Sequence, residues 1–195
     1  MIAFVRGQFV QKQPARVVVD VNGVGYDLQI SLHTYSFIAD KEAGQLFTYV
    51  HITENAQTMF GFAELSEKEI FLQLISVSGV GAATARMMLS GMKPEEITKA
   101  IVQGNIKQLE SIKGIGKKSA ERLIVELRDK LGKQHVDTVF TGGIANAMPG
   151  LDAVNALISL GIAKPVAEQA VKKAISLNPE PVALEDLIKN ALKNL

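Results

Sequence analysis

Two Gly-x-Gly sequences carry the clearest chemical pattern in this chain. Gly79-Val80-Gly81 and Gly114-Ile115-Gly116 lie 35 residues apart, and each directly precedes a predicted helix. Glycine permits a tight backbone path and leaves neighbouring amide groups uncovered. At a helix N-terminus several N–H groups lack intrahelical partners and the dipole is positive, so such a turn can bind an anion. For a nucleic-acid duplex that anion is the backbone phosphate.

Basic side chains accompany the second hairpin. Lys117 and Lys118 follow it directly, and Arg122 lies one turn beyond Lys118 on the same helix face. Residues 107–133 hold eight basic and four acidic side chains, a net +4 in a chain of net +1. A local basic excess indicates a surface for polyanions. Charge alone would favour an ordinary solvated helix face, but the duplicated hairpin shifts the interpretation to DNA binding.

The hairpins belong to an internal repeat. Residues 74–85 align with residues 109–120 without a gap, and Leu, Ser, both glycines and the last Ala recur in register. Each copy predicts helix, hairpin and helix, with the apolar residue between the glycines filling the gap between the two helices. After the second hairpin, apolar residues from Ala120 to Leu131 recur at helical spacing and predict a core-facing side. Two copies indicate a duplicated motif, not a solenoid.

Other chemistry has little support in the sequence. No Gly-x4-Gly-Lys-Ser/Thr phosphate loop occurs, and Thr84 and Ser119 stand where a dinucleotide fingerprint needs Gly or Ala. The chain has no cysteine, which excludes disulfides and thiolate metal sites. His33, His51 and His135 lie in different segments without a carboxylate at metal-ligand spacing. We therefore expect no metal and no cofactor.

Residues 1–63 predict a small β-barrel. Asn22-Gly23 favours a type I′ hairpin because both residues tolerate positive φ, and Glu54-Asn55 marks the tip of a second hairpin. A closed OB-type barrel removes exposed edges and suits short strands, with an SH3-like barrel as the alternative. The five expected strands are Ile2–Val10, Arg16–Val21, Val24–Ile30, Phe47–Thr53 and Ala56–Phe62.

The rest of the chain predicts helices, so the fold class is multidomain α+β. Residues 64–134 form the all-α hairpin domain, residues 135–149 a Gly-containing linker, and residues 150–195 a small domain that is marginal alone. Gly161 can end the first helix of that domain in a left-handed conformation. Its three expected helices are Leu151–Leu160, Pro165–Ser176 and roughly Val182–Leu195. No apolar run approaches the ~20 residues of a membrane helix and no signal peptide is recognised, which favours a cytoplasmic protein.

The two hairpins resemble helix-hairpin-helix DNA-binding motifs, and the whole chain resembles the RuvA family, the DNA-binding subunits of the bacterial Holliday junction branch migration complex. The GIGKKSAERLIVEL block is the most specific part of this resemblance. The matching stretches also include MIAFVRG, VNGVGYDLQI, ENAQTMFGF, LISVSGVG, LSGM and DAVNALISLG. The resemblance implies an OB-fold domain, a tandem helix-hairpin-helix domain, a linker and a three-helix, UBA-like domain.

The resemblance also implies partners and roles. It implies a homotetramer, sometimes paired as an octamer, that holds an open four-way junction in DNA recombination, repair and the SOS response to DNA damage. A RuvB-type hexameric ATPase would be the motor, and a RuvC-type junction resolvase a further partner. Glu54 and Asn55 would form an acidic pin at the junction centre. The implied motor contacts are Leu157, Leu160, Ile162 and Leu192, and the candidate DNA contacts are Gly79, Val80, Gly81, Thr84, Arg86, Gly114, Ile115, Gly116, Lys117, Lys118, Ser119 and Arg122.

Two positions depart from the family pattern. Ala82 and Ala83 follow the first hairpin where the family often has a lysine, so this hairpin must rely on backbone amides with help from Arg86. The pin carries one acid, Glu54, where the family often has two adjacent acids.

Two other classes of function stay open at this level. One is a helix-hairpin-helix nuclease or glycosylase with Asp129 or Asp137 as catalyst, although no paired carboxylates accompany them. The other is an interaction adaptor whose basic patch is incidental. The sequence favours a non-catalytic subunit that recognises junction shape, because phosphate contacts carry no base-sequence information.

Overall fold

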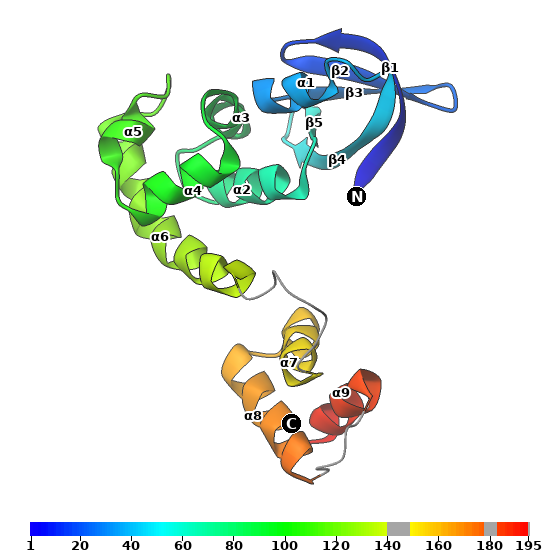
Figure 1. The fold of residues 1–195 in the computed structure, drawn as a ribbon, viewed down its shortest axis with the longest axis vertical. Helices are drawn as coiled ribbons and strands as arrows, with labels where there is room; N and C mark the ends of the chain where they lie inside the picture. Colours follow the sequence, from blue (N-terminus) through cyan, green and yellow to red (C-terminus); the bar gives the residue numbers. More distant parts are fainter. Residues whose placement is uncertain (140–148, 178–182, 195) are drawn as a thin grey trace. The chain divides into compact units, whose positions relative to one another are not determined.

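The computed structural model describes residues 1–139, 149–177 and 183–194 (Figure 1), and the chain divides into two compact units at Val139. In the first unit, five strands close into a barrel in the order β1-β2-β3-β5-β4. The strands are β1 (Phe4–Gln13), β2 (Arg16–Val21), β3 (Val24–Ile30), β4 (Ala43–Ile52) and β5 (Gln57–Phe62). Strands β3 and β5 are parallel neighbours, joined by a crossover through α1 (Leu32–Ile38) and β4. This non-sequential order confirms the predicted OB-type barrel.

Turn chemistry and strand pairing explain the barrel's details. Asn22 and Gly23 have φ of +53° and +88°, as the predicted type I′ hairpin requires. Strand β4 begins at Ala43, four residues before the expected start at Phe47. The missed residues include Gly44, which pairs with Gly7 of β1, and glycine weakens a strand pattern. Glycine is required at position 7, because a Cβ there would lie 1.9 Å from the carbonyl oxygen of Asp20.

The helices of the first unit confirm the predicted duplicated motif. They are α2 (Leu65–Ile75), α3 (Ala82–Gly91), α4 (Pro94–Val102), α5 (Ile106–Glu110) and α6 (Lys117–Val139). Helices α2 and α3 flank the first hairpin, α5 and α6 flank the second, and α4 connects the copies. The apolar face of α6 is buried at Ala120, Leu123, Leu127 and Leu131, as its helical spacing predicts.

The barrel has a core of its own, and strand β5 also shares a second core with the helices of the first unit. Phe71 of α2 packs against Phe60 and Phe62 of β5, with ring centroids 5.0 and 4.9 Å apart. This shared core explains why residues on both sides of position 63 fall into one compact unit. Helix α6 runs to Val139, beyond position 134, and most of the expected linker falls on residues 140–148, outside the described residues.

Three helices of the described residues make up the second unit: α7 (Pro149–Ser159), α8 (Lys164–Leu177) and α9 (Leu184–Lys193). Gly161 has φ of +92° and ends α7 as predicted, and the Ile162 amide donates back to the Leu157 carbonyl at 3.1 Å. The core is small and alanine-rich. The expected break at residues 178–181 lies outside the described residues.

Candidate nucleic-acid interface

The two hairpins have the same backbone geometry. The Val80 amide donates to the Val77 carbonyl at 3.0 Å, and at the equivalent place the Ile115 amide donates to the Ile112 carbonyl at 3.1 Å. Val80 and Ile115 are each 5% exposed and belong to the shared core. The predicted role of the residue between the glycines, filling the gap between two helices, is therefore confirmed in both copies.

The glycines around each plug residue have two different roles. Gly79 and Gly114 have positive φ, where an L side chain is strained. Gly81, in contrast, has φ of −82°, which any residue adopts. A Cβ on Gly81 or Gly116 would meet no atom of the described residues within 4 Å. Since neither the backbone nor the packing of the described chain requires glycine at position 81, its absent side chain leaves room for an outside group.

Free amides line this open space. The first intrahelical bond of α3 runs from the Ala85 amide to the Gly81 carbonyl, and that of α6 from Ala120 to Gly116, both at 2.9 Å. The three amides before each bond, at residues 82–84 and 117–119, have no intrahelical acceptor. Among the described residues, no side chain caps α3 at Gly81. Thr84 and Ser119, the third residues of these helices, are half-buried.

The second hairpin carries exposed lysine side chains. Lys117 and Lys118 are exposed, and neither forms an ion pair with any residue that the structure describes. Lys113, which the sequence candidates do not include, is also exposed and stands directly before Gly114. Its position within the basic segment 107–133 is the sequence feature that could have marked Lys113 as a DNA contact. The second hairpin therefore combines exposed amides with three neighbouring lysines.

The two candidate arginines are engaged elsewhere. Arg122 Nε lies 2.9 Å from Glu126 Oε1 in an exposed i,i+4 pair. Such pairs contribute only about 0–1 kcal/mol, so a phosphate can compete for Arg122. Arg86 Nη1 donates to the carbonyl of Ala15 in the β1–β2 turn at 3.2 Å, which ties α3 to the barrel. The first hairpin thus has backbone amides and no neighbouring lysine.

Helix α3, which follows the first hairpin, also approaches the second. The sulfur of Met87 on α3 lies 4.0 Å from where a Cβ on Gly114 would stand. Glu54 and Asn55 lie apart from them on the barrel, at the exposed β4–β5 tip, which is closed by a bond from the Thr53 amide to the Ala56 carbonyl at 2.9 Å. The structure therefore places a residue of the first copy beside the second hairpin, and the acidic tip on another element.

The candidate motor contacts divide between surface and core. Leu160 is 66% exposed, Leu192 is 41% exposed, and Ile162 is half-buried. Leu157 is 0% exposed and lies in the core of the second unit. The core interpretation therefore holds for Leu157, which can support its neighbours but cannot meet a partner directly.

The residues proposed for enzymatic alternatives are scattered. Among the described residues, no group of three His, Asp or Glu side chains is placed to hold a metal ion. Asp129 is exposed on α6, and the side chains of Asp137 and His135 lie outside the described part. His33 Nε2 lies 3.3 Å from Glu64 Oε2, and His51 packs beside Phe60.

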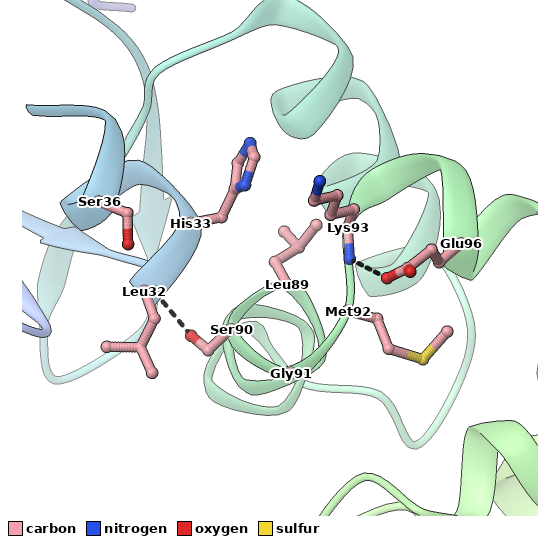
Figure 2. Close-up of a pocket in the computed structure, with 9 residues that line it drawn as sticks. All are labelled: Leu32, His33, Ser36, Leu89, Ser90, Gly91, Met92, Lys93 and Glu96. Carbon is pink, nitrogen blue, oxygen red and sulfur yellow. Dashed lines mark hydrogen bonds between the residues drawn. The ribbon is translucent and has the colours of Figure 1, made fainter.

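A pocket of about 410 Å³ opens between α1 and the α3–α4 turn (Figure 2). Two hydrogen bonds join residues that line it: the Leu32 amide donates to Ser90 Oγ at 3.1 Å, and the Lys93 amide donates to Glu96 Oε2 at 2.9 Å. Because these groups serve a helix cap and a contact with the barrel, the pocket is a seam between packed elements.

No helix in the described ranges is both long and apolar enough to cross a membrane.

The barrel and the duplicated glycine hairpins define a tandem helix-hairpin-helix protein. Comparison with protein families agrees: residues 71–129 match the SAM-like helix-hairpin-helix tandem, residues 1–61 the RuvA N-terminal domain, and residues 151–195 the RuvA C-terminal domain. The chain belongs to the RuvA family.

Relatives match over nearly the full length. The Holliday junction branch migration complex subunit RuvA of Cytophaga hutchinsonii is 44% identical over 197 residues, with 99% of each chain covered. The proteins of that name from Christiangramia forsetii and Flavobacterium psychrophilum are 44% and 45% identical, with 100% of each chain covered.

Proposed function

We propose that this chain binds four-way (Holliday) DNA junctions as a homotetramer, independently of base sequence, holds them open and recruits a RuvB-type hexameric ATPase for branch migration. The observation that carries the proposal is the pair of matching hairpins whose second glycines leave helix N-terminal amides open to an outside anion. The names of the full-length relatives support the same function.

Phosphate is the DNA group that these hairpins suit. Amides at a helix N-terminus and exposed lysines bind phosphate oxygens without reading bases. The second hairpin adds Lys117 and Lys118 to its amides, whereas the first relies on the amides following Gly81. Branch migration requires sliding along any sequence, which base-specific contacts would oppose.

The barrel contributes the acidic tip. In a fourfold tetramer, one Glu54 from each subunit would stand near the strand crossover, where carboxylates repel phosphates and direct the strands outward into the arms. The exposure of the β4–β5 tip supports this assignment.

The second unit contacts the motor. Leu160 and Leu192 are exposed apolar side chains and Ile162 is half-buried, and exposed apolar patches mark interaction sites. The proposed division is an OB-fold domain (1–63), a hairpin domain (64–134), a linker (135–149) and a motor-binding domain (150–195). The separation of residues 140–195 from residues 1–139 as a compact unit supports only the independence of the last domain from the first two.

The chain is non-catalytic in this proposal. It contains no Gly-x4-Gly-Lys-Ser/Thr motif, so ATP hydrolysis is assigned to the RuvB-type partner. The complex acts in the cytoplasm, in DNA recombination and repair, and a RuvC-type resolvase can share the junction. Pairing of two tetramers into an octamer is the alternative assembly.

A gel-shift titration of a synthetic four-way junction against linear duplex of equal length tests the proposal. We expect preferential, salt-sensitive binding of the junction. Equal affinity for both forms would contradict junction recognition, and no binding to either would favour the adaptor. Cleavage of either DNA after addition of magnesium would favour the nuclease alternative.

A further inference from the structure

A buried carboxylate, which the proposed DNA contacts do not use, lies where the barrel meets α2. Glu67 is 0% exposed. Its carboxylate accepts hydrogen bonds from the Ser31 hydroxyl, from the Thr34 hydroxyl at 2.6 Å and from the Ala63 amide at 3.3 Å. A buried charge is costly unless it is hydrogen-bonded, so this group is held by three donors from the barrel side of the joint.

The bonds around Glu67 form a directed network. Ser31 Oγ accepts from the Thr34 amide at 3.0 Å and thereby caps α1, while Thr34 Oγ1 accepts from the Ala63 amide at 3.0 Å. Both hydroxyls therefore accept a hydrogen bond from a backbone amide and donate a hydrogen bond to the carboxylate of Glu67. The network has a single consistent direction, and removing one member takes a hydrogen bond away from a buried polar group.

Helix α2 connects the two proposed DNA-contacting parts. Glu67 lies in its first turn, and the first glycine hairpin follows its other end at Ser76. Strand β5 enters α2 through only Ala63 and Glu64, and β5 is one arm of the hairpin that carries Glu54. The orientation of α2 on the barrel therefore sets where the acidic tip stands relative to the first glycine hairpin.

The other contacts at this joint are less directional or more exposed. Packing of Phe71 on Phe60 and Phe62 is apolar and sets no unique angle. The bonds from Leu32 to Ser90 and from Arg86 to Ala15 lie at the surface, the former beside the open pocket in Figure 2. The Glu67 network is the buried, directional part of the joint.

We propose that Glu67 is a positioning residue that locks α2 to the barrel, so that the acidic tip and the first glycine hairpin move as one rigid body. Its consequence for junctions rests on the proposed function: without the lock, phosphate binding by the hairpins persists while strand separation at the junction centre weakens. The rigid connection between α2 and the barrel is a property of the free protein, and it can be tested without DNA.

The test measures the distance between the two parts. The chain lacks cysteine, so Gln57→Cys on β5 and Ser78→Cys in the first hairpin give specific sites for spin labels. Pulsed electron paramagnetic resonance then reports the distance distribution within one subunit, with labelled chains diluted by excess unlabelled chain. We expect a narrow distribution in the parent protein and a broadened one with Glu67→Gln or Thr34→Val.

Matched variants separate locking from general destabilisation. Thr98→Val removes another buried hydroxyl, one bonded to the Pro94 carbonyl within α4, and should leave the distribution narrow. Thr34→Ser keeps the hydroxyl and should retain the narrow distribution. In Thr34→Val, deuterium exchange at the Ala63 amide should rise roughly 5- to 30-fold, the effect of losing one net hydrogen bond.

An unchanged distribution in Thr34→Val would overturn the lock, including when Glu67→Gln fails to fold. Equal broadening in Thr98→Val would overturn it too, because the effect would then be general loosening. Both results would leave the DNA proposal standing. Conversely, a parent protein that binds no junction but shows the expected distributions would overturn the proposed function and leave the lock intact.

Discussion

Gly79 and Gly114 adopt the same left-handed backbone conformation, with φ of +91° and +94°, at equivalent positions of two hairpins 35 residues apart. The second glycine of each hairpin, in contrast, borders space that the described chain leaves empty. The backbone conformation thus requires the first glycine, whereas the proposed phosphate binding uses the open space at the second. These two requirements can be separated by substitution.

Gly81→Ser should increase stability and weaken junction binding. Gly81 is the N-cap of α3, where serine caps better than glycine by a few tenths of a kcal/mol because its hydroxyl accepts an amide of the first turn. The same hydroxyl competes with phosphate for those amides, and losing one hydrogen bond to a charged group lowers affinity by roughly tenfold or more. Thermal unfolding and junction titration measure the two effects. Ala183→Ser, which adds a cap to α9, should stabilise the second unit and leave DNA binding unchanged.

Replacing Lys117 and Lys118 with alanine should weaken binding and flatten its salt dependence. Both lysines are exposed beside the amides of α6. For every phosphate that a subunit no longer neutralises, the slope of log affinity against log salt should fall by about 0.9. The control is the double alanine variant of Lys172 and Lys173, an exposed pair on α8, whose slope should equal that of the parent. If both double variants behave alike, these lysines contribute only net charge.

Glu54→Gln should leave junction affinity equal or higher while reducing strand opening at the centre. Two unit charges roughly 4 Å apart repel by between about 1 and about 4 kcal/mol, depending on the local dielectric. A fluorescent base analogue at the crossover reports the opening. Asp40→Asn, at another exposed turn of the barrel, serves as control and should change neither quantity. Weaker binding by an intact Glu54→Gln tetramer would count against a repulsive tip.

Leu160→Ser should abolish stimulation of the RuvB-type ATPase while circular dichroism and junction binding stay unchanged, and adding Ile162→Ser, which also touches the core of the second unit, should deepen the loss. Leu160 is exposed, so its replacement removes contact surface and no core volume. Leu157→Ala should instead destabilise the second unit by about 2–5 kcal/mol, because it empties a buried site.

A chain ending near Gly150 should bind junctions but fail to drive branch migration. Full migration by that chain would refute the assignment of the second unit as the contact with the ATPase.

Local pattern predicted most of the fold and the hairpins. Turn chemistry at Asn22-Gly23, the 35-residue repeat and the apolar face of α6 each depend on neighbours in sequence. The engagement of Arg86 with the Ala15 carbonyl could not be predicted this way, because it joins residues 71 positions apart. The same applies to Glu67, whose hydroxyl partners come from 33 and 36 residues away. Periodicity could not separate core from surface at Leu157 because both interpretations place an apolar residue there.

Competition binding tests junction recognition by phosphate contacts most directly. A labelled four-way junction held by the full chain is challenged with unlabelled competitors of equal length: a junction of unrelated base sequence, and linear duplexes of both sequences. We predict that the unrelated junction competes as well as the original and that both duplexes compete poorly. Displacement by the linear duplexes as effective as by the junctions, or only by DNA of one sequence, would contradict recognition of junction shape through the paired glycine hairpins.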